Sequence, residues 1–198
     1  MKTDGLLAAL AHAIDGPDAT RATLGEIVAR LESRGYGMLL FLFSAPNLTP
    51  GPSIPGFSTV FALPLAAIAL QMALGVAHPK LPGFLGRLGL ARPRARSILG
   101  QLGPLLSRVE RLFVPRWPAL CGPAARRWIG VVAIVEAGLL LLPLPVLPLI
   151  PSLALVVLSL GLVAKDGRAV AFGLLLCAAA AAAFLAALVF GAAALGLA

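Results

Sequence analysis

The stretch RGYGMLLFLFSAPNLTPGPSIPGFST, residues 34–59, decides the fold. Its apolar arm, residues 37–48, would span roughly 18 Å as a helix, against a bilayer core of roughly 30 Å. The arm ends in a cluster of prolines and glycines, where a helix interior would lose several hydrogen bonds. An apolar return arm follows at residues 60–77. The sequence therefore predicts a broken helical hairpin over residues 37–78.

The composition of the whole chain is that of a membrane protein. Of the 198 residues, 60% are hydrophobic and 12% are charged, and the mean hydropathy is +0.98, whereas soluble domains carry about 25% charged residues. The apolar residues form continuous runs instead of alternating with polar ones. We therefore expect a single membrane domain over residues 1–198. Because no cleavable signal peptide is apparent, we expect insertion through internal segments.

The formal net charge of +8 is concentrated in one segment. Residues 79–127 carry ten basic residues against Glu110 alone, whereas residues 1–36 carry four basic and five acidic residues. The basic segment lies between apolar runs and lacks the interleaved aromatic residues of nucleic-acid binders, so no nucleic-acid partner is expected. The positive-inside bias explains the same charges as a cytoplasmic or interfacial segment.

Two amphipathic helices are expected beside the first hairpin. Residues 20–36 place apolar side chains at helical spacing, and Thr23 with Glu26 fits a capping box. A second apolar face follows at residues 98–113, with Trp117 beyond it as an interface anchor. This second helix is expected either in the plane of the membrane surface, with its basic face toward anionic headgroups, or as a cytosolic helix that covers the hairpins.

The first hairpin has a second copy further along the chain. A shift of 93 residues, without a gap, aligns Gly37 with Gly130, Thr59 with Ser152, and three prolines of one cluster with three of the other. Two apolar copies of this kind predict a duplicated membrane unit whose broken helices meet within the bilayer.

The second broken hairpin covers residues 128–165, with arms expected at residues 129–142 and 153–164. Basic residues stand at both ends of each hairpin, so both ends should lie on one, cytoplasmic side. Each hairpin is either re-entrant or a two-pass hairpin whose turn reaches the far interface, and the short arms favour the re-entrant form. Residues 169–198 carry no charge and are long enough to form a C-terminal transmembrane helix.

The expected fold class is therefore an all-α integral membrane protein with duplicated, proline-broken helical hairpins, interfacial amphipathic helices and a C-terminal transmembrane helix. Two hairpins that enter from the same side would need a second subunit to build a symmetric path across the membrane, so a homodimer is a hypothesis. The run Ala178–Ala183, with Gly173 and Gly191, offers a close-packing face for it.

Few residues in the apolar arms could carry chemistry. Glu136 is the one ionisable residue inside an arm; there it either exchanges protons or holds a cation, or it is a protonated or paired structural residue. Asn47, Ser58 and Thr59 cluster at the first break, and Ser152 stands at the second. Their side chains either satisfy carbonyls freed by the prolines or lie where helix N-termini point toward an anionic group such as phosphate.

No pattern in the sequence indicates catalysis. Cys121 and Cys177 have neither CxxC nor Cys/His spacing, and no Gly-rich phosphate loop, nucleophile elbow or metal-ligand pair is present. We expect neither an enzyme nor a cofactor nor a metal.

A family resemblance covers nearly the whole chain after residue 20. The segments that carry it are TLGEIVARLESRGYGMLLFLFSAPNLTPGPSIPGFSTVFALPLAAIALQMALG, GPAARRWIG and SLGLVAKDGRAVAFG. They resemble the bacterial ExoD-type exopolysaccharide synthesis proteins, which implies a small inner-membrane protein linked to exopolysaccharide production but no known reaction. The family-like positions are Leu24, Gly25, Glu26, Arg34, Gly35, Gly37, Pro46, Asn47, Pro50, Pro55, Ser58, Thr59, Gln71, Arg126, Arg127, Asp166 and Gly167. The second proline cluster departs from the pattern, since it lacks a Gly-Asn pair before its final proline.

The leading hypothesis is a multi-pass transport or lipid-handling protein whose partners are membrane lipids, among them an anionic lipid-linked sugar or polyprenyl phosphate. The arginines would meet the phosphate at the cytoplasmic interface, and the polar residues of the first break would lie deeper. The candidate binding residues are Arg34, Asn47, Ser58, Thr59, Arg126, Arg127, Glu136 and Ser152. The alternatives are a non-transporting scaffold of the exopolysaccharide machinery and a proton-coupled ion exchanger that uses Glu136.

Overall fold

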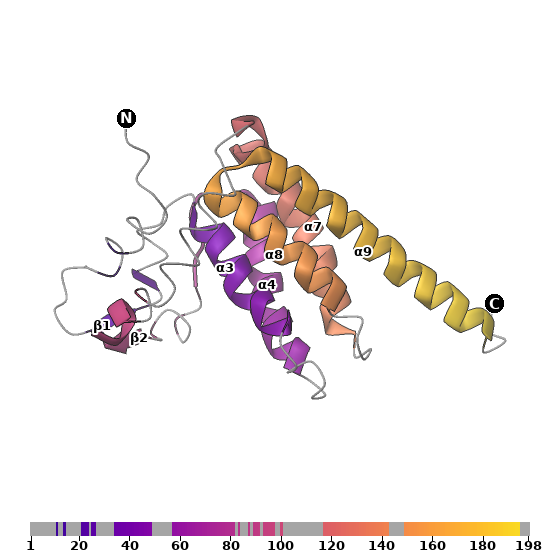
Figure 1. Cartoon of the computed structure of the whole chain (residues 1–198), viewed down its shortest axis with the longest axis horizontal. Coiled ribbons are helices and arrows are strands. Elements are labelled where there is room, and N and C mark those ends of the chain that lie inside the picture. Colours follow the sequence, from indigo (N-terminus) through magenta and orange to yellow (C-terminus); the bar gives the residue numbers. More distant parts are fainter. Residues whose placement is uncertain are drawn as a thin grey trace.

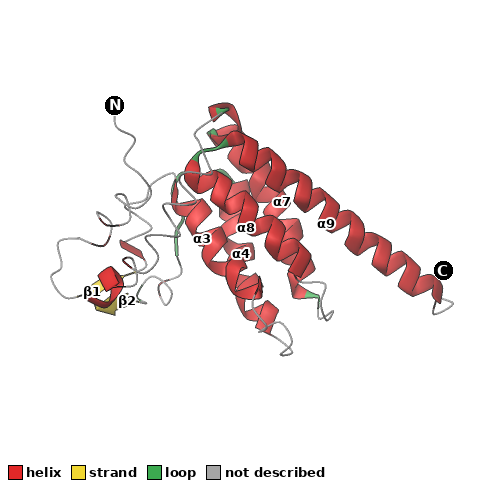
Figure 2. Cartoon of the chain, viewed as in Figure 1, coloured by secondary structure: helices red, strands yellow, loops and turns green. Residues whose placement is uncertain are grey.

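The computed structural model describes residues 34–48, 57–81, 117–142 and 149–194, together with shorter pieces between residues 11 and 26 and between residues 83 and 100. The regular elements among them are helices, apart from one short strand pair (Figure 2). The helices are α3 (Gly35–Ser44), η2 (Ala45–Leu48), α4 (Phe57–Ala73), η4 (Pro118–Cys121), α7 (Pro123–Leu141), α8 (Leu149–Ala164) and α9 (Gly167–Ala194).

The first hairpin is formed by α3, η2 and α4, as the sequence predicts. The first arm tightens into the 3-10 turn η2, where Asn47 donates from Nδ2 to the Phe43 carbonyl oxygen at 3.3 Å. The return arm is helical from Phe57 and continues through Pro64. It ends earlier than expected, because Gly75 adopts φ +76° and closes a Schellman motif in which Val76 N donates to Gln71 O at 3.0 Å. The proline-rich residues 49–56 lie outside the described part.

The second hairpin is formed by α7 and α8, and both of its helices start earlier than expected. The start of α7 is Pro123 instead of residue 129, because proline suits the first helical position after the extended Gly122. The start of α8 is Leu149 instead of residue 153, since Pro151 lies in the first turn, where its missing N–H costs no hydrogen bond. Residues 143–148 are not described.

The two hairpins pack against each other arm by arm (Figure 1). The first arm α3 packs on α8, and the return arm α4 packs on α7, with α9 laid along α8. An added Cβ at Gly37 would meet Ser159 O at 2.9 Å, and one at Gly130 would meet Ala69 O at 2.9 Å. Each of the two aligned glycines thus lies where a helix of its own hairpin comes close to a helix of the other hairpin. Two copies related by a two-fold axis would pair in this way, and the duplication itself stays a prediction.

The C-terminal helix α9 is the one helix among the described residues that is long and apolar enough to cross a membrane, over Gly167–Phe190. Figure 1 shows it extending beyond the rest of the bundle toward the C-terminus. Two further apolar helices, α4 and α8, are shorter. Gly173 was expected on a dimer face, but an added Cβ there would meet the Leu158 backbone, so this glycine serves packing between α8 and α9.

Of the helix expected at residues 20–36, residues 20, 24 and 27–33 lie outside the described part, and residues 35–36 belong to α3. Its capping box is confirmed, because Thr23 N donates to Glu26 Oε2 and Glu26 N donates to Thr23 Oγ1, each at 3.3 Å. Thr23 is therefore the cap, and it is also the last residue of β1 (Arg21–Thr23), which pairs antiparallel with β2 (Gly89–Ala91). The bundle is all-α, as predicted, and the strands among the described residues are these two, of three residues each. The amphipathic face at residues 98–113 lies outside the described residues except for Gly100.

Candidate functional site

Five helix ends meet at one end of the bundle, which we call the cationic end: the starts of α3, α7 and α9 and the last turns of α4 and α8. Tyr36 in α3 is 1% exposed, and its hydroxyl donates to Val76 O at 2.8 Å. Arg126 in α7 donates from Nη1 to Ala77 O at 3.4 Å, and its guanidinium carbon lies 5.9 Å from the centroid of the Tyr36 ring. These contacts tie the start of α3 and the start of α7 to the turn after α4.

Basic side chains gather at the cationic end. Arg34 is the residue before α3, half-buried like Arg126, whereas Arg127, Lys165 and Arg168 are exposed. The acidic residue at this end, among those described, is Asp166, which is buried and accepts hydrogen bonds at Oδ1 from Arg168 N at 2.9 Å and Ala169 N at 3.4 Å. That carboxylate caps α9 through these two backbone contacts, and the described residues of this end carry a net positive charge.

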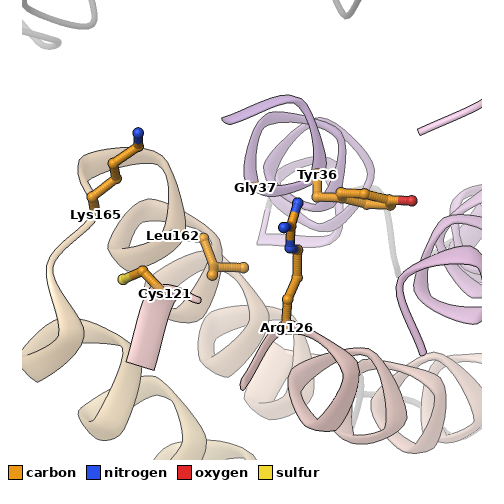
Figure 3. Close-up of a pocket in the computed structure, with 6 residues that line it drawn as sticks. All are labelled: Tyr36, Gly37, Cys121, Arg126, Leu162 and Lys165. Atoms are coloured by element: carbon orange, nitrogen blue, oxygen red, sulfur yellow. The ribbon is translucent and has the colours of Figure 1, made fainter. Parts of the chain in front are cut away.

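A small hollow opens in the cationic end. Its lining residues are Tyr36, Gly37, Cys121, Arg126, Leu162 and Lys165. Figure 3 shows Arg126 beside the Tyr36 ring, with Lys165 on the far side of Cys121 and Leu162. Burial raises the pKa of the Cys121 thiol, Asp166 raises it further, and Lys165 opposes both. The thiol thus stays neutral, and the charges of the hollow are the two cations on either side.

The second arginine of the pair, Arg127, supports the turn after α4. An added Cβ at Gly75 would collide with the Arg127 guanidinium. The turn is also closed by Gln71, which donates from Nε2 to Lys80 O at 2.9 Å and accepts from Lys80 N at Oε1 at 2.7 Å. Arginines beside the C-terminal turn of a helix meet its free carbonyls and the negative end of its dipole. Arg126 is therefore held at this turn by its bond to Ala77 O, and the Arg127 guanidinium lies against the same turn.

Three buried polar side chains form a second group, which we call the polar layer: Asn47 on η2, Glu136 on α7 and Ser152 on α8. They are 0%, 1% and 0% exposed. Asn47 Oδ1, Glu136 Oε2 and Ser152 Oγ have no hydrogen-bond partner in the described part of the chain. Of the other residues predicted at the first break, Ser58 and Thr59 lie half-buried in the first turn of α4.

The structure does not bring the arginines and the polar layer together. Asn47 follows Gly37 by ten residues and Glu136 follows Arg126 by ten residues, about 15 Å of helix in each case. Ser152 precedes Ser159, the residue level with Gly37, by seven residues, or about 10 Å. One phosphate group cannot contact both sets of residues. The candidate site therefore consists of a surface site at the cationic end and an internal polar layer.

Some residues of the cationic end were not singled out by the sequence. Tyr36 contacts both the turn after α4 and the Arg126 guanidinium. In the sequence, however, a tyrosine between two glycines forms no distinctive pattern. Lys165 adopts φ +56°, which a sequence of this kind does not reveal. The Asp-Gly pair at residues 166–167 did carry a signal, since aspartate is a preferred helix N-cap. Among the described residues, no group of three His, Cys, Asp or Glu side chains could hold a metal ion.

Comparison with known proteins covers almost the whole chain. Residues 4–186 match the model of a family described as "Exopolysaccharide synthesis, ExoD". The chain belongs to the ExoD family. Relatives of this ExoD-family chain include Protein ExoD of Rhizobium meliloti, which is 33% identical over 155 residues, covering 76% of this chain and 64% of the relative. A second is the uncharacterized protein slr1875 of Synechocystis, 25% identical over 153 residues, covering 77% of this chain and 72% of the relative.

The match to the ExoD family confirms the resemblance drawn from the sequence. The chain spans less than two thirds of the length of the Rhizobium relative. No solved structure matches the chain. Several family-like positions have structural roles here. Glu26 completes a capping box, and Gly37 lets α3 approach α8 closely. Gln71 closes the turn after α4, and Asp166 caps α9.

Proposed function

We propose that this ExoD-family chain is a multi-pass protein of the bacterial inner membrane that acts in exopolysaccharide synthesis by binding the phosphate group of an anionic lipid-linked sugar or polyprenyl phosphate. It binds and positions this lipid and is not an enzyme. The observation that carries the proposal is the cationic end of an apolar bundle, where Arg126 and Lys165 line one hollow. Arg34 and Arg127 stand at the starts of α3 and α7 at the same end.

The outer surface of the bundle supports a membrane location. Large apolar side chains are exposed on four helices: Val60, Leu63, Leu70 and Leu74 on or just after α4, Val131 and Val135 on α7, Ile150 and Leu153 on α8, and Phe172, Leu175 and Leu185 on α9. Water would oppose so large an apolar surface, whereas lipid would not. Trp117 and Trp128, both exposed near the cationic end, occupy the position of interfacial anchors.

The lengths of three of the four hairpin helices fit the two-pass form, whereas α3 has 10 residues, or about 15 Å. With 17, 19 and 16 residues, α4, α7 and α8 would measure about 24–28 Å, close to the thickness of the hydrocarbon core. In this arrangement the cationic end faces the cytoplasm, as the positive-inside bias requires, and the two breaks reach the far interface.

The phosphate would bind between the arginines and Lys165. Arginine presents a planar set of donors that matches phosphate oxygens, and lysine adds a mobile point charge. The polyprenyl chain would lie along the exposed apolar surface that begins just below this end. Because Asn47 and Ser152 lie about 10–15 Å deeper, they are not assigned to the phosphate.

The test is binding of a polyprenyl phosphate to the purified full chain, compared with binding of the matching polyprenol. An Arg126→Ala/Arg127→Ala variant should lose affinity for the phosphate by about tenfold or more, the equivalent of one charge-assisted contact, and keep its weaker affinity for the alcohol. An Arg87→Ala/Arg94→Ala variant removes the same charge from exposed positions outside the hollow and should bind like the parent.

Equal phosphate affinity in the Arg126/Arg127 variant and the parent would exclude the proposed site. It would favour the scaffold function instead, in which the basic segment holds the protein on anionic membranes and binds no specific lipid.

A homodimer remains part of the proposal, with α9 as its contact. Ala178, Ala179, Ala182 and Ala183 are exposed on α9, and small residues allow helices to approach closely in a membrane. Cross-linking between cysteines introduced at Ala179 would reveal the dimer, and a cysteine at the buried Ala180 is the matched control.

A further inference from the structure

The polar layer lies in an otherwise apolar interior and has no task in phosphate binding. Its members come from three separate elements, and each has one buried polar atom without a partner: Asn47 Oδ1, Glu136 Oε2 and Ser152 Oγ. Buried polar atoms of native proteins are almost always hydrogen-bonded, so three unpaired atoms in the same half of the bundle require an explanation.

The depth of the three residues follows from the helix contacts. Gly37 is level with Ser159 and Val163, which places α3 antiparallel to α8. Counted from these contacts, Asn47 and Ser152 lie about 15 Å and 10 Å toward the broken ends. Glu136 lies about 15 Å from Arg126 in the same direction. Because η2 and α7 both pack on α8, the three residues lie in the same half of the bundle, away from the cations.

No positive side chain is within reach of Glu136 in the described bundle. The helices packed against α7 are α4, α8 and α9, besides the turn η4 at the cationic end. Neither α4 nor α8 contains a titratable residue. The contributions of α9 are Arg168, in its first turn, and Cys177, whose thiol lies close enough to interact electrostatically with the Glu136 carboxyl. A bare carboxylate in such a place is costly unless it binds a proton or a cation.

From this geometry we propose that Glu136 is a reversible proton-binding site inside the bundle, served by water held in the polar layer. A buried water needs two to four polar partners, and the three unpaired oxygens are the acceptors that the described interior offers in this half of the bundle. Binding adds a proton to the carboxylate and release returns it to this water, so no other reactant is required. Proton-coupled exchange through the bundle would need such a group, and the interior of α3, α4 and α8 offers no second carboxyl.

The proposal is tested by chemical labelling of the full chain in lipid vesicles. An apolar carbodiimide reacts with a protonated carboxyl in a water-poor site, and mass spectrometry of peptides locates the adduct. The peptide that contains Glu136 should be labelled at acidic pH, and labelling should fall as the pH is raised. A water-soluble carbodiimide should leave it unlabelled, and Glu136→Gln should abolish the adduct. Absence of label at every pH would overturn the proposal.

The role of the layer is tested with two matched serines on α8. Ser152→Ala and Asn47→Ala should move the midpoint of the labelling curve to higher pH, because fewer polar groups remain to solvate the carboxylate. Ser159→Ala should leave the midpoint in place, because Ser159 is equally buried but its hydroxyl already donates to Val156 O at 2.7 Å. If the labelling midpoint is the same in Ser152→Ala, in Asn47→Ala and in the parent, the three residues do not form one site.

Two further outcomes are decisive. Sodium ions at constant pH should not protect Glu136 from the carbodiimide. If they do, the carboxylate binds a monovalent cation, and the assignment of a proton site is overturned. The Arg126→Ala/Arg127→Ala variant should label like the parent, so a failure of the phosphate site and a failure of the proton site can be told apart.

Discussion

At Gly130 the backbone of α7 lies so close to α4 that an added Cβ would collide with Ala73 N and meet Ala69 O at 2.9 Å. The sequence identified Gly130 and its counterpart Gly37 through their alignment, but not their contacts. It also singled out Asn47, Glu136 and Ser152, because polar side chains are conspicuous in apolar runs. Whether such side chains are paired depends on neighbours from other elements, which no local pattern encodes.

The close crossing at Gly130 makes the first prediction. Gly130→Ala should lower the free energy of unfolding by about 1–3 kcal/mol, because α7 must move away from α4. Gly138→Ala, on the same helix with no atom within 4 Å of the added Cβ, should raise stability by about 0.5–1 kcal/mol through helix propensity. Thermal unfolding of both variants in detergent measures the difference, and equal midpoints would contradict the crossing.

At the scale of elements, the order of helix, break and helix in each hairpin was predictable from the sequence, whereas the residues at which the helices begin and end were not. Prolines at 143, 145 and 148 mark the second break, but Pro151 is tolerated inside the first turn of α8 and Pro123 starts α7. At the join of α8 and α9 the left-handed residue is Lys165, although glycine follows two positions later. Asp166 N donates to Gly161 O at 2.9 Å and ends α8, while its carboxylate starts α9.

The double role of Asp166 gives a prediction for α9. Asp166→Ala should destabilise the chain by about 1 kcal/mol, because two N–H groups of the first turn lose their acceptor. Asp166→Asn keeps a capping oxygen and should restore most of that loss. Hydrogen exchange of the Arg168 and Ala169 amides measures it directly, and unchanged protection in Asp166→Ala would rule out the cap.

For the whole molecule, the sequence predicted two hairpins but not how they pair. The helices α3, α4 and α8 are apolar on nearly every side, so no polar stripe shows which face is buried. The pairing of α3 with α8 and of α4 with α7 follows from side-chain fit and from Gly37 and Gly130. The gathering of cations at one end was predictable, because the positive-inside bias predicts that hairpin ends that carry basic residues lie on one side.

The proposed bundle crosses the membrane with its cationic end in the cytoplasm and both breaks on the far side. Single cysteines at Ser53, at Val146 and at Arg94, in a chain with Cys121→Ser and Cys177→Ala, test this through a membrane-impermeant thiol reagent applied to either face of the inner membrane. We predict that the cysteines at 53 and 146 are labelled from the periplasm alone and the cysteine at 94 from the cytoplasm alone. Protection of positions 53 and 146 from both sides, or their labelling from the cytoplasm, would contradict the account.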